Sequence, residues 1–571
     1  MTISGIGVSP GIAIGKARVI KKQAVVLTGT LLSNDEGITI AIEKFDHAVA
    51  ASITEVEAMM SSYDTSQGSE GLEILEAHIE LLGDPQIRED VVEKIQTERK
   101  NVNDAVIEVI QDAVEVFKSM DDEYLSARAA DVEDIGNRII RNLNSVADSN
   151  HDYEAGTIII AEDLTPSDTI SMDITKITGF AIQTGGKTSH AAIIAKSRGI
   201  PAVIGCGESL KSVQDGDELI LDGQTGSVII NPDQKTMQDF EVKRDAWLKE
   251  LNLLKLLKDT PAQTIDGKEI HLLANIADSA EMENALEFGA QGSGLFRTEF
   301  LFLGRNDFPS EDEQFEFYKA VALKAKGKPV TVRTLDIGGD KQLSYFNFPE
   351  EQNPFLGYRA IRLCLDRKDI FITQLKAILR ASAFGKLKIM FPMIATVNEI
   401  RAAKIILKEA MQELTDQGIT FDQHIKIGIM IEIPSAAVIA DLLAKEVGFF
   451  SIGTNDLIQY TLAVDRMNEK IKDLYDPFDP GVLRLIVNVI EQGHKNHIEV
   501  GMCGELAGDP RAALLLLGMG LTEFSMSASS IPLVKSKIIR TNLTEARKIY
   551  EAVRQMDNSK YIINYLQEKT Q

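Results

Sequence analysis

The chain has 571 residues, with 85 acidic and 60 basic side chains and a formal net charge of −25. A chain this acidic argues against general binding to nucleic acid or anionic membranes, since both require basic surfaces. The length allows about three to five domains, and the apolar content of 44% is typical of a soluble globular protein.

The first 20 residues alternate apolar side chains with glycines and predict short strands and turns. They contain no basic segment followed by an apolar core, so they do not indicate a secretory signal. No run of 18 apolar residues occurs in the sequence, which argues against a membrane span. Cys206, Cys364 and Cys503 are too few and too widely spaced for a disulfide framework or a zinc site, and they favour a reducing cytoplasm.

A helical period follows, in which Ile38, Ile42 and Phe45 recur every three or four positions. It predicts an antiparallel helical hairpin or bundle over residues 34–143. Residues 31–145 hold 26 acidic and 9 basic side chains, so they carry −17 of the total charge of −25. Composition alone favours solubility as the reason, and a basic protein partner is the alternative.

Short apolar runs that end in Gly, Pro, Asp or Asn come next, among them GTIIIAED, ITGFAIQTGG and ELILDG. They predict strands of a small α/β domain that also includes the first strands, over residues 1–33 and 144–233. The helical segment would then be an insertion. Residues 234–260 are expected to form a linker helix with Trp247 and Leu251 near one face, and an ordinary packed helix fits the same pattern.

Strand and helix patterns alternate through residues 261–571. The strand candidates are EIHLLANI, SGLFRTEF, VTVRTLDIGG, LKIMFPMI, IKIGIMIEIP, FFSIGTND, EVGMCGE and TEFSMS. Eight such repeats predict a (β/α)8 barrel of the TIM type. The predicted fold class is therefore a multidomain α/β protein: a small α/β domain with an inserted helical bundle, then a C-terminal barrel.

Polar residues with chemical uses follow many of these barrel strands, where the active sites of such barrels lie. They are Arg297, Arg333, Glu432, Asn455, Asp456, Cys503 and Glu505, with Arg359, Arg362 and Arg466 in or near other loops. Guanidinium groups suit a small, multiply charged anion, and a pair of carboxylates suits Mg²⁺ or Mn²⁺. For any one residue, a structural ion-pair network is an equal alternative. Cys503 can be a proton donor or an inert buried residue, while Cys206 and Cys364 are expected to be structural.

A second candidate site lies in GGKTSHAAIIAKSRGIPAV, residues 185–203. Thr188 or Ser189 can cap a helix that begins near His190, and a histidine at a helix N-terminus can hold a phosphoryl group. Spacing alone favours a capping-turn histidine without chemistry. No ATP-binding or NAD-binding fingerprint occurs, and the pair His494 and His497 is expected to be solvated.

Together these motifs resemble the enzyme I family of the bacterial phosphoenolpyruvate-dependent sugar phosphotransferase system. The resemblance rests on SGIGVSPGIAIGKA, LTPSDT, GGKTSHAAIIAKSRGIPA, GLFRTEFLF, VRTLDIGGDK, SIGTNDLIQYTLAVDR and GMCGELAGDP. It implies a cytoplasmic enzyme that transfers the phosphoryl group of phosphoenolpyruvate to its own histidine, releases pyruvate, and then phosphorylates the histidine-containing phosphocarrier protein HPr. A homodimer formed through the barrel is also implied.

The resemblance implies a role for each site residue. His190 is expected to be phosphorylated on Nε2, with Thr169 nearby, and Cys503 to protonate the enolate. Glu432 and Asp456 are expected to hold Mg²⁺, with Mn²⁺ possible. The implied substrate contacts are Arg297, Arg333, Asn455, Asp456, Arg466, Lys341 and Arg359. The helical insertion is expected to dock HPr, and its acidic surface to attract a basic face of that protein.

The departures from the family pattern are small. Lys187 stands where arginine is common, Met467 where other members have glycine, and residue 352 is Gln. Rival readings are a dikinase of the phosphoenolpyruvate synthase type, a non-catalytic phosphoenolpyruvate sensor and a barrel lyase such as an aldolase. The dikinase needs an ATP-binding domain, and the lyase leaves His190 unexplained. Because His190 and the barrel fall in different domains, the sequence also predicts a swivel about the 234–258 helix.

Overall fold

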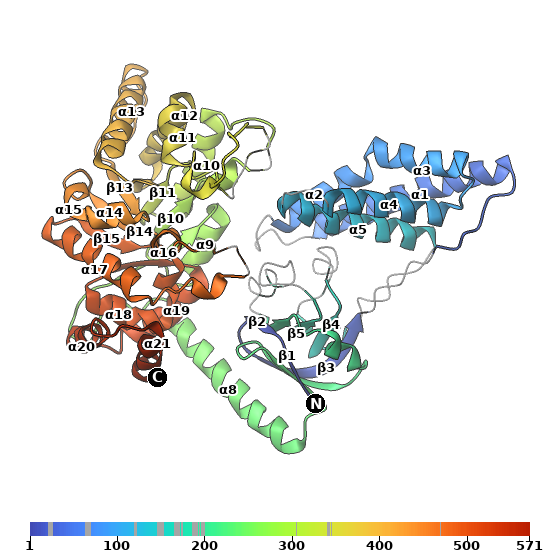
Figure 1. Ribbon diagram of the computed structural model, residues 1–571, viewed down its shortest axis with the longest axis horizontal. Coiled ribbons are helices and arrows are strands. Elements are labelled where there is room, and N and C mark those ends of the chain that lie inside the picture. Colours follow the sequence, from blue (N-terminus) through green and yellow to red (C-terminus); the bar gives the residue numbers. More distant parts are fainter. Residues whose placement is uncertain are drawn as a thin grey trace. The chain divides into compact units, whose positions relative to one another are not determined.

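The structure is a computed structural model, and it describes residues 1–20, 27–62, 70–118, 123–144, 153–164, 172, 175–184, 192, 195, 200–303, 305–339, 343, 345–466, 468 and 470–570. Contacts divide the chain into two units, Met1–Glu250 and Leu251–Gln571. Figure 1 labels their elements in chain order. Within these ranges, every helix is too short or too polar to cross a membrane.

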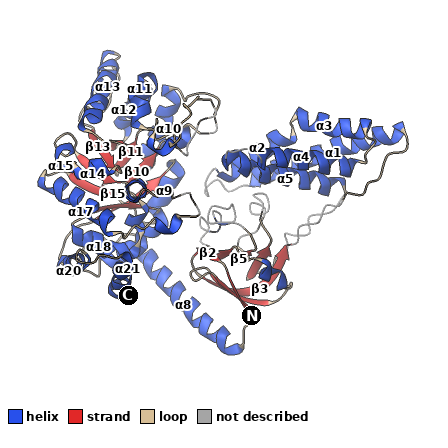
Figure 2. Cartoon of the chain, in the orientation of Figure 1, coloured by secondary structure: helices blue, strands red, loops and turns tan. Residues whose placement is uncertain are grey.

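An eight-stranded sheet is the centre of the α/β part of the first unit (Figure 2). Its strands in spatial order are β1 (Thr2–Ser4), β8 (Ser227–Ile230), β7 (Glu218–Asp222), β3 (Ile12–Ile20), β4 (Thr157–Ala161), β5 (Ile177–Ile182), β6 (Ala202–Ile204) and β2 (Ile6–Ser9). β3 pairs parallel with β4 and antiparallel with β7. The prediction that the first strands pair with much later ones is therefore confirmed.

Helices fill the sequence between β3 and β4. In the described residues they are α1 (Asp35–Ser62), α2 (Glu70–Leu82), α3 (Pro85–Thr97), α4 (Val102–Lys118) and α5 (Glu123–Leu143). Their apolar faces share one core that includes Phe45, Leu75, Val106 and Ile135. The predicted helical insertion is confirmed, and its boundaries as domain limits stay a prediction.

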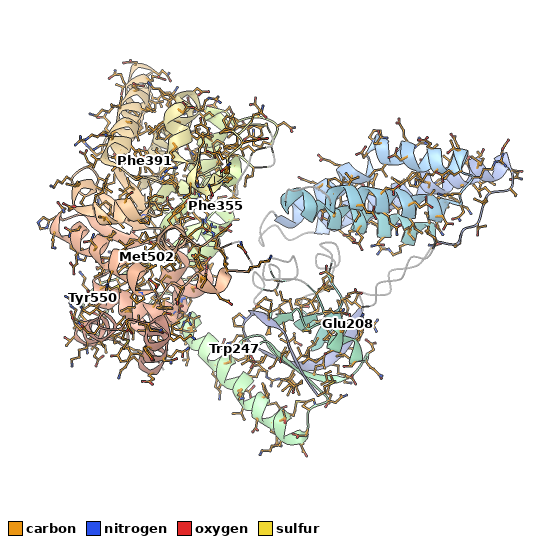
Figure 3. The ribbon with its side chains drawn as sticks, in the orientation of Figure 1. Glu208, Trp247, Phe355, Phe391, Met502 and Tyr550 are labelled. Atoms are coloured by element: carbon orange, nitrogen blue, oxygen red, sulfur yellow. The ribbon has the colours of Figure 1, made fainter. Side chains whose placement is uncertain are left out.

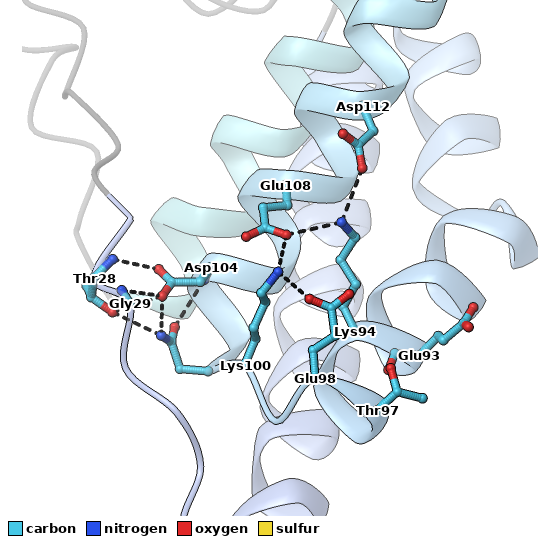
Figure 4. Close-up of polar contacts among 11 residues, drawn as sticks. Thr28, Gly29, Glu93, Lys94, Thr97, Glu98, Lys100, Asp104, Glu108 and Asp112 are labelled. Atoms are coloured by element: carbon cyan, nitrogen blue, oxygen red, sulfur yellow. Dashed lines mark hydrogen bonds and ion pairs between the residues drawn. The ribbon is translucent and has the colours of Figure 1, made fainter.

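Asp104 ties the segment before α1 to the start of α4 (Figure 4). Its carboxylate accepts hydrogen bonds from the backbone N–H groups of Thr28 and Gly29, at 2.9 and 2.8 Å, and from the Asn101 side-chain amide at 2.6 Å. Burial acts to raise the pKa of Asp104, but these hydrogen bonds hold the pKa below its ordinary value. The carboxylate thus stays ionised and fixes the entry to the helical part.

Helix α8 (Gln234–Leu256) crosses the boundary between the two units, and contacts in each unit hold it. Trp247, labelled in Figure 3, packs on Gly11 in the first unit, where an added Cβ would lie 2.7 Å from the indole ring. In the second unit, the buried Lys535 ammonium donates to the carbonyl oxygens of Leu257 and Lys258, at 2.6 and 2.9 Å. These bonds hold two carbonyls just after the last residue of the helix, and the Leu257 carbonyl also accepts from the Thr260 N–H at 3.0 Å.

The second unit contains a closed barrel of parallel strands. In order they are β9 (His271–Ile276), β10 (Ser293–Arg297), β11 (Val330–Arg333), β12 (Leu387–Phe391), β13 (Lys426–Ile431), β14 (Phe449–Ile452), β15 (Glu499–Met502) and β16 (Glu523–Met526). β16 pairs with β9, which closes the ring. Each of the eight predicted strand segments contains one of these strands, so the (β/α)8 prediction is confirmed.

Helices alternate with the barrel strands and surround them (Figure 1). They are α9 (Ser279–Glu287), α10 (Glu311–Lys324), α11 (Ile361–Asp366), α12 (Lys368–Ala381), α13 (Val397–Asp416), α14 (Pro434–Val438), α15 (Ala440–Leu443), α16 (Thr454–Leu462), α17 (Pro480–Lys495), α18 (Pro510–Met519), α19 (Ile531–Ile538), α20 (Leu543–Val553) and α21 (Ser559–Thr570). A small separate cluster contains Leu295, Met390, Met430, Phe449 and Cys503. It does not belong to the core shared with the helices, so we infer that it fills the inside of the barrel.

Candidate active site at the strand ends of the barrel

The structure places four of the predicted site residues directly at the carboxyl ends of barrel strands. Arg297 ends β10 and Arg333 ends β11, and the two residues are partners in the strand register. Glu432 follows β13, and Cys503 follows β15. Parallel strands bring these ends to one face of the barrel, so the four side chains start from the same face.

Asn455 and Asp456 differ slightly from the expectation, because they lie in the first turn of α16 and not at a strand end. The Asn455 side chain is fixed by Glu505: its Nδ2 donates to a carboxylate oxygen at 3.3 Å, and its Oδ1 accepts from the Glu505 backbone at 3.1 Å. Arg466 follows the same helix, and its Nη1 lies 3.7 Å from Asp456 Oδ1. Both acidic and cationic groups therefore converge at the start of α16.

A buried ion network holds two of the predicted arginines. Arg333 Nη1 lies 2.8 Å from Asp336 Oδ2, and Arg333 Nη2 donates to Glu299. Arg359 Nη2 donates to the other oxygen of Asp336 at 2.9 Å. All four residues are 6% exposed or less. Burial acts to lower the pKa of both arginines, but the neighbouring carboxylates raise it above the ordinary value, so both side chains stay charged.

Several buried polar atoms of this region have no hydrogen-bond partner among the described residues. They are Nε of Arg333 and of Arg359, Oγ1 of Thr454 and Oδ1 of Asp456. Buried polar atoms in proteins are nearly always hydrogen-bonded. Two of these atoms are donors on cationic groups, one is a hydroxyl and one is a carboxylate oxygen. Without hydrogen-bond partners at one face of the barrel, they indicate a place for a polar, anionic ligand.

Glu432 and Asp456 are close enough to repel each other. Glu432 is 1% exposed, and its Oε1 accepts from the Met393 backbone N–H at 2.5 Å. Burial, and then the charges of Asp456 and Asp336, raise the pKa of Glu432 to about 8. A divalent cation between the two carboxylates would remove this repulsion.

The pair fits Mg²⁺ by its chemistry. Mg²⁺ in proteins takes one or two carboxylates and completes its shell with waters and substrate phosphate oxygens. Among the residues that the structure describes, no cluster of three or more His, Cys, Asp or Glu side chains is arranged around a metal position. Two carboxylates, one of them with a buried oxygen that accepts no hydrogen bond among the described residues, suit an ion that shares a ligand with the substrate.

Cys503 has the environment of a protonated thiol. It is 4% exposed, and burial raises its pKa to about 11. Its backbone carbonyl accepts from Asn275 Nδ2 at 2.9 Å, and Asn275 Oδ1 accepts from the Ser525 hydroxyl at 2.7 Å. At neutral pH the thiol therefore carries a proton and has a fixed backbone, as a proton donor requires.

Two further expectations can be compared with the structure. Arg362 does not join the site, because its Nη1 donates to the backbone carbonyls of Leu356 and Gly357, at 2.7 and 2.9 Å. It supports the loop that precedes α11. His494 and His497 are both exposed, as expected for solvated side chains.

Seven residues named from the sequence lie outside the described residues. They are Thr169, Lys187, Thr188, Ser189, His190, Lys341 and Met467. Their predicted roles therefore stay predictions. Conversely, the structure adds Glu299 and Asp336, which sequence reasoning missed, although both lie within motifs that it had quoted, GLFRTEFLF and VRTLDIGGDK.

Comparison with known families gives three matches along the chain. Residues 4–128 match the N-terminal domain of PEP-utilising enzymes, residues 153–226 the mobile domain of PEP-utilising enzymes, and residues 252–543 the PEP-binding domain of PEP-utilising enzymes. The first match covers β2, β3 and most of the helical part, the second lies within the α/β part, and the third covers the barrel.

Curated proteins are similar over the full length. The chain is 46% identical over 567 residues to the phosphoenolpyruvate-protein phosphotransferase of Bacillus subtilis (strain 168), covering 99% of both chains. It is 44% identical over 569 residues to the protein of the same name from Staphylococcus carnosus (strain TM300), covering 100% of this chain and 99% of that one. A solution structure of an Enzyme I protein is 40% identical and covers 43% of this chain and 99% of its own, with a TM-score of 0.38.

Proposed function

The chain belongs to the phosphoenolpyruvate-protein phosphotransferase family, and we propose how its residues divide the reaction of that family. It is a transferase of the sugar phosphotransferase system that takes its phosphoryl group from phosphoenolpyruvate. We assign substrate binding to the barrel, phosphoryl acceptance to His190, and onward transfer to a histidine of the phosphocarrier protein HPr.

Phosphoenolpyruvate binds at the strand ends of the barrel in this proposal. The open Nε donors of Arg333 and Arg359 suit its phosphate and carboxylate oxygens. Arg297 and Arg466, both half-buried, add positive charge from β10 and from the loop after α16. Asn455 contributes an amide that Glu505 already holds in place, and Lys341 joins from its position in the sequence motif.

Glu432 and Asp456 would hold Mg²⁺, or Mn²⁺ in its place. When bound, the ion neutralises charge on the phosphoryl and enolate oxygens. The residues themselves orient the substrate and exclude water. The Met393 N–H fixes one Glu432 oxygen, and Asp456 Oδ1 accepts no hydrogen bond among the described residues, with only Arg466 Nη1 at 3.7 Å.

These groups account for every bond and proton that changes in the reaction. His190 Nε2 attacks phosphorus, with Thr169 expected beside the ring, so the bond from phosphorus to the enol oxygen breaks and a P–N bond forms. The electron pair left on the enolate takes the Cys503 proton at C3, which gives pyruvate. A thiol whose pKa is about 11 is protonated at neutral pH and can supply that proton.

His190 and the barrel belong to different contact units, so the two must meet during the reaction. We expect a swivel about α8, whose Trp247 is fixed to the first unit and whose C-terminal end is fixed to the second. Scattering profiles or single-molecule distances should change when phosphoenolpyruvate is added. Identical distances in both states would contradict the swivel.

Docking of HPr is assigned to the helical part, whose acidic excess suits a basic partner face.

We also propose a homodimer formed through the barrel unit. Exposed Val438 and Leu474 (62% and 61%) and the 46% exposed Leu442 supply apolar surface there. Light scattering should then show a dimer for the wild type and a larger share of monomer for Val438→Asp.

We place the reaction in the cytoplasm, in agreement with three free, buried cysteines.

The observation that carries the assignment is the set of open polar atoms of Arg333, Arg359 and Asp456 at one face of the barrel. The test is incubation with ³²P-labelled phosphoenolpyruvate and Mg²⁺ without ATP. We expect acid-labile label on the wild type, none on His190→Ala, and full label on the control His494→Ala, which alters an exposed barrel histidine.

The same experiment separates the rivals. A dikinase would also take label from phosphoenolpyruvate, but it would pass the label to a nucleotide and not to added HPr. A phosphoenolpyruvate sensor would bind the substrate without becoming labelled. A barrel lyase would act on its substrate equally well with His190→Ala. A wild type without label would therefore contradict the proposed function.

A further inference from the structure

Asp336 is a buried carboxylate that no step of the proposed reaction uses. It is 1% exposed, and each of its oxygens pairs with a different arginine, Oδ2 with Arg333 Nη1 at 2.8 Å and Oδ1 with Arg359 Nη2 at 2.9 Å. We propose that Asp336 is a positioning residue that orients both guanidinium groups toward phosphoenolpyruvate. This inference rests on the proposed function of the barrel site.

Both guanidinium groups are held on two sides. Glu299 accepts from Arg333 Nη2, so Arg333 has a carboxylate at each terminal nitrogen. The Tyr460 hydroxyl accepts from Arg359 Nη1 at 3.4 Å. A planar fork held at both terminal nitrogens cannot rotate, so the directions of its remaining N–H groups are fixed. Each terminal nitrogen keeps a second N–H, and Nε is the nitrogen left without a hydrogen-bond partner among the described residues.

The backbone beside Arg359 is also constrained. Ala360 has φ 50° and ψ −124°, a conformation that a residue with a Cβ rarely adopts. Its N–H donates to the Ile337 carbonyl at 2.9 Å, and an added Cβ at Gly338 would lie 2.6 Å from the Cβ of Arg359. Such strain persists only where the surrounding contacts specify the conformation. The loop thus brings Arg359 to Asp336 at the cost of backbone strain.

Asp336 also keeps the arginines away from the two carboxylates assigned to the metal. Arg333 interacts electrostatically with Glu432, and Arg359 with Asp456. Without the charge of Asp336, each guanidinium would be drawn toward these carboxylates and would compete with a divalent cation. The role therefore predicts two linked losses, in substrate affinity and in cation affinity.

The test is Asp336→Asn in the full chain, a variant of similar size that removes the charge. We expect kcat/KM for phosphoenolpyruvate to fall at least about 30-fold, with KM rising at least about tenfold, because misdirected guanidiniums lose both binding and orientation. The half-saturating Mg²⁺ concentration should rise as well. The control Asp369→Asn breaks an exposed pair with Arg367 and should change neither constant by more than about twofold.

A second measurement separates positioning from folding. In ¹H–¹⁵N spectra of the arginine Nε–H groups, we expect wild-type signals of Arg333 and Arg359 to shift when phosphoenolpyruvate and Mg²⁺ are added. In Asp336→Asn these signals should broaden or move already in the absence of ligand. If this variant does not fold, Tyr460→Phe decides, because it removes one contact to Arg359 without leaving a charge unpaired. It should raise KM about threefold.

Each outcome has one meaning. A wild type that releases no pyruvate would overturn the proposed function itself. If the wild type is active and Asp336→Asn keeps the wild-type kinetic constants and Nε signals, only the positioning role is overturned. If Asp336→Asn does not fold, an unchanged KM in Tyr460→Phe has the same consequence.

Discussion

The barrel and the helical part use charge in opposite ways. In the barrel, Arg333 and Asp336 are buried and share partners in one network. In the helical part, the pair of Arg88 and Asp46 is 55% and 43% exposed, at 2.8 Å. Buried ions interact strongly and hold one geometry, whereas exposed ions are screened by salt and hold little. Charge that positions a substrate must be buried, and charge that attracts a partner must face water.

The largest effect that follows from this contrast is in the barrel. Arg333→Lys keeps the charge but loses the planar fork, so we expect kcat/KM for phosphoenolpyruvate to fall about 100- to 1,000-fold. Steady-state pyruvate release measures it. The control Arg367→Lys alters an exposed arginine paired with Asp369 and should remain within about twofold of the wild type. Equal losses of kcat/KM in Arg333→Lys and Arg367→Lys would contradict the difference between buried and exposed charge.

The metal pair should give the next effect. Glu432→Gln removes one hard oxygen anion, so the Mg²⁺ concentration for half-maximal activity should rise at least about tenfold. Calorimetry of Mg²⁺ binding provides a readout that does not depend on turnover. Glu446→Gln is the control, because Glu446 pairs with Arg401, which is 62% exposed. An unchanged cation requirement in Glu432→Gln would remove this residue from the metal assignment.

Salt should act on the helical part more than on the barrel. We expect the rate of transfer to the phosphocarrier protein to fall about tenfold between low and physiological salt, because exposed charges steer the encounter. Phosphorylation of the enzyme by phosphoenolpyruvate should change less over the same range. Rapid-quench measurements of both steps on one preparation give the comparison. A transfer rate that does not respond to salt would return the acidic excess to a role in solubility.

The smallest effect concerns stability within the helical part. Asp104→Ala removes an acceptor of several hydrogen bonds and should cost about 1–3 kcal/mol in unfolding free energy, whereas Asp46→Ala should cost no more than about 1 kcal/mol. Because the folded-state pKa of Asp104 is lowered, its contribution is full above the unfolded-state pKa and is lost as pH falls through the folded value. Denaturant titrations of the wild type and Asp104→Ala should therefore differ at neutral pH and converge at acidic pH.

The sequence was sufficient to predict the barrel strands and the residues at their ends. Each strand is rich in apolar residues, and Arg333 ends one of them while Glu432 follows another, so position alone indicated a site. The pairing among these residues was not predictable. Asp336 joins Arg333 to Arg359, which is 23 positions away, and only the folded loop brings that partner into reach.

Arg362 shows that the sequence also suggested a site residue that the structure places elsewhere. From the sequence it resembles the neighbouring Arg359, three positions earlier, although Arg362 lies in α11 and Arg359 in the segment before it. The structure gives one guanidinium to Asp336 and the other to the backbone carbonyls of Leu356 and Gly357. The two arginines are the same residue type and lie three positions apart, so only their contacts separate the one proposed to bind substrate from the one that binds backbone.

The sheet of the first unit has a consequence for how the chain is made. β1 pairs with β8, so Thr2 lies opposite Ile229, and the whole helical insertion comes between. At about 5–20 residues per second, the first strand leaves the ribosome roughly 10–45 s before its partner exists. The five helices have their core residues close in sequence and can fold during that interval. The α/β part therefore completes its fold after the domain inserted into it, and its first strands stay without their sheet partners until then.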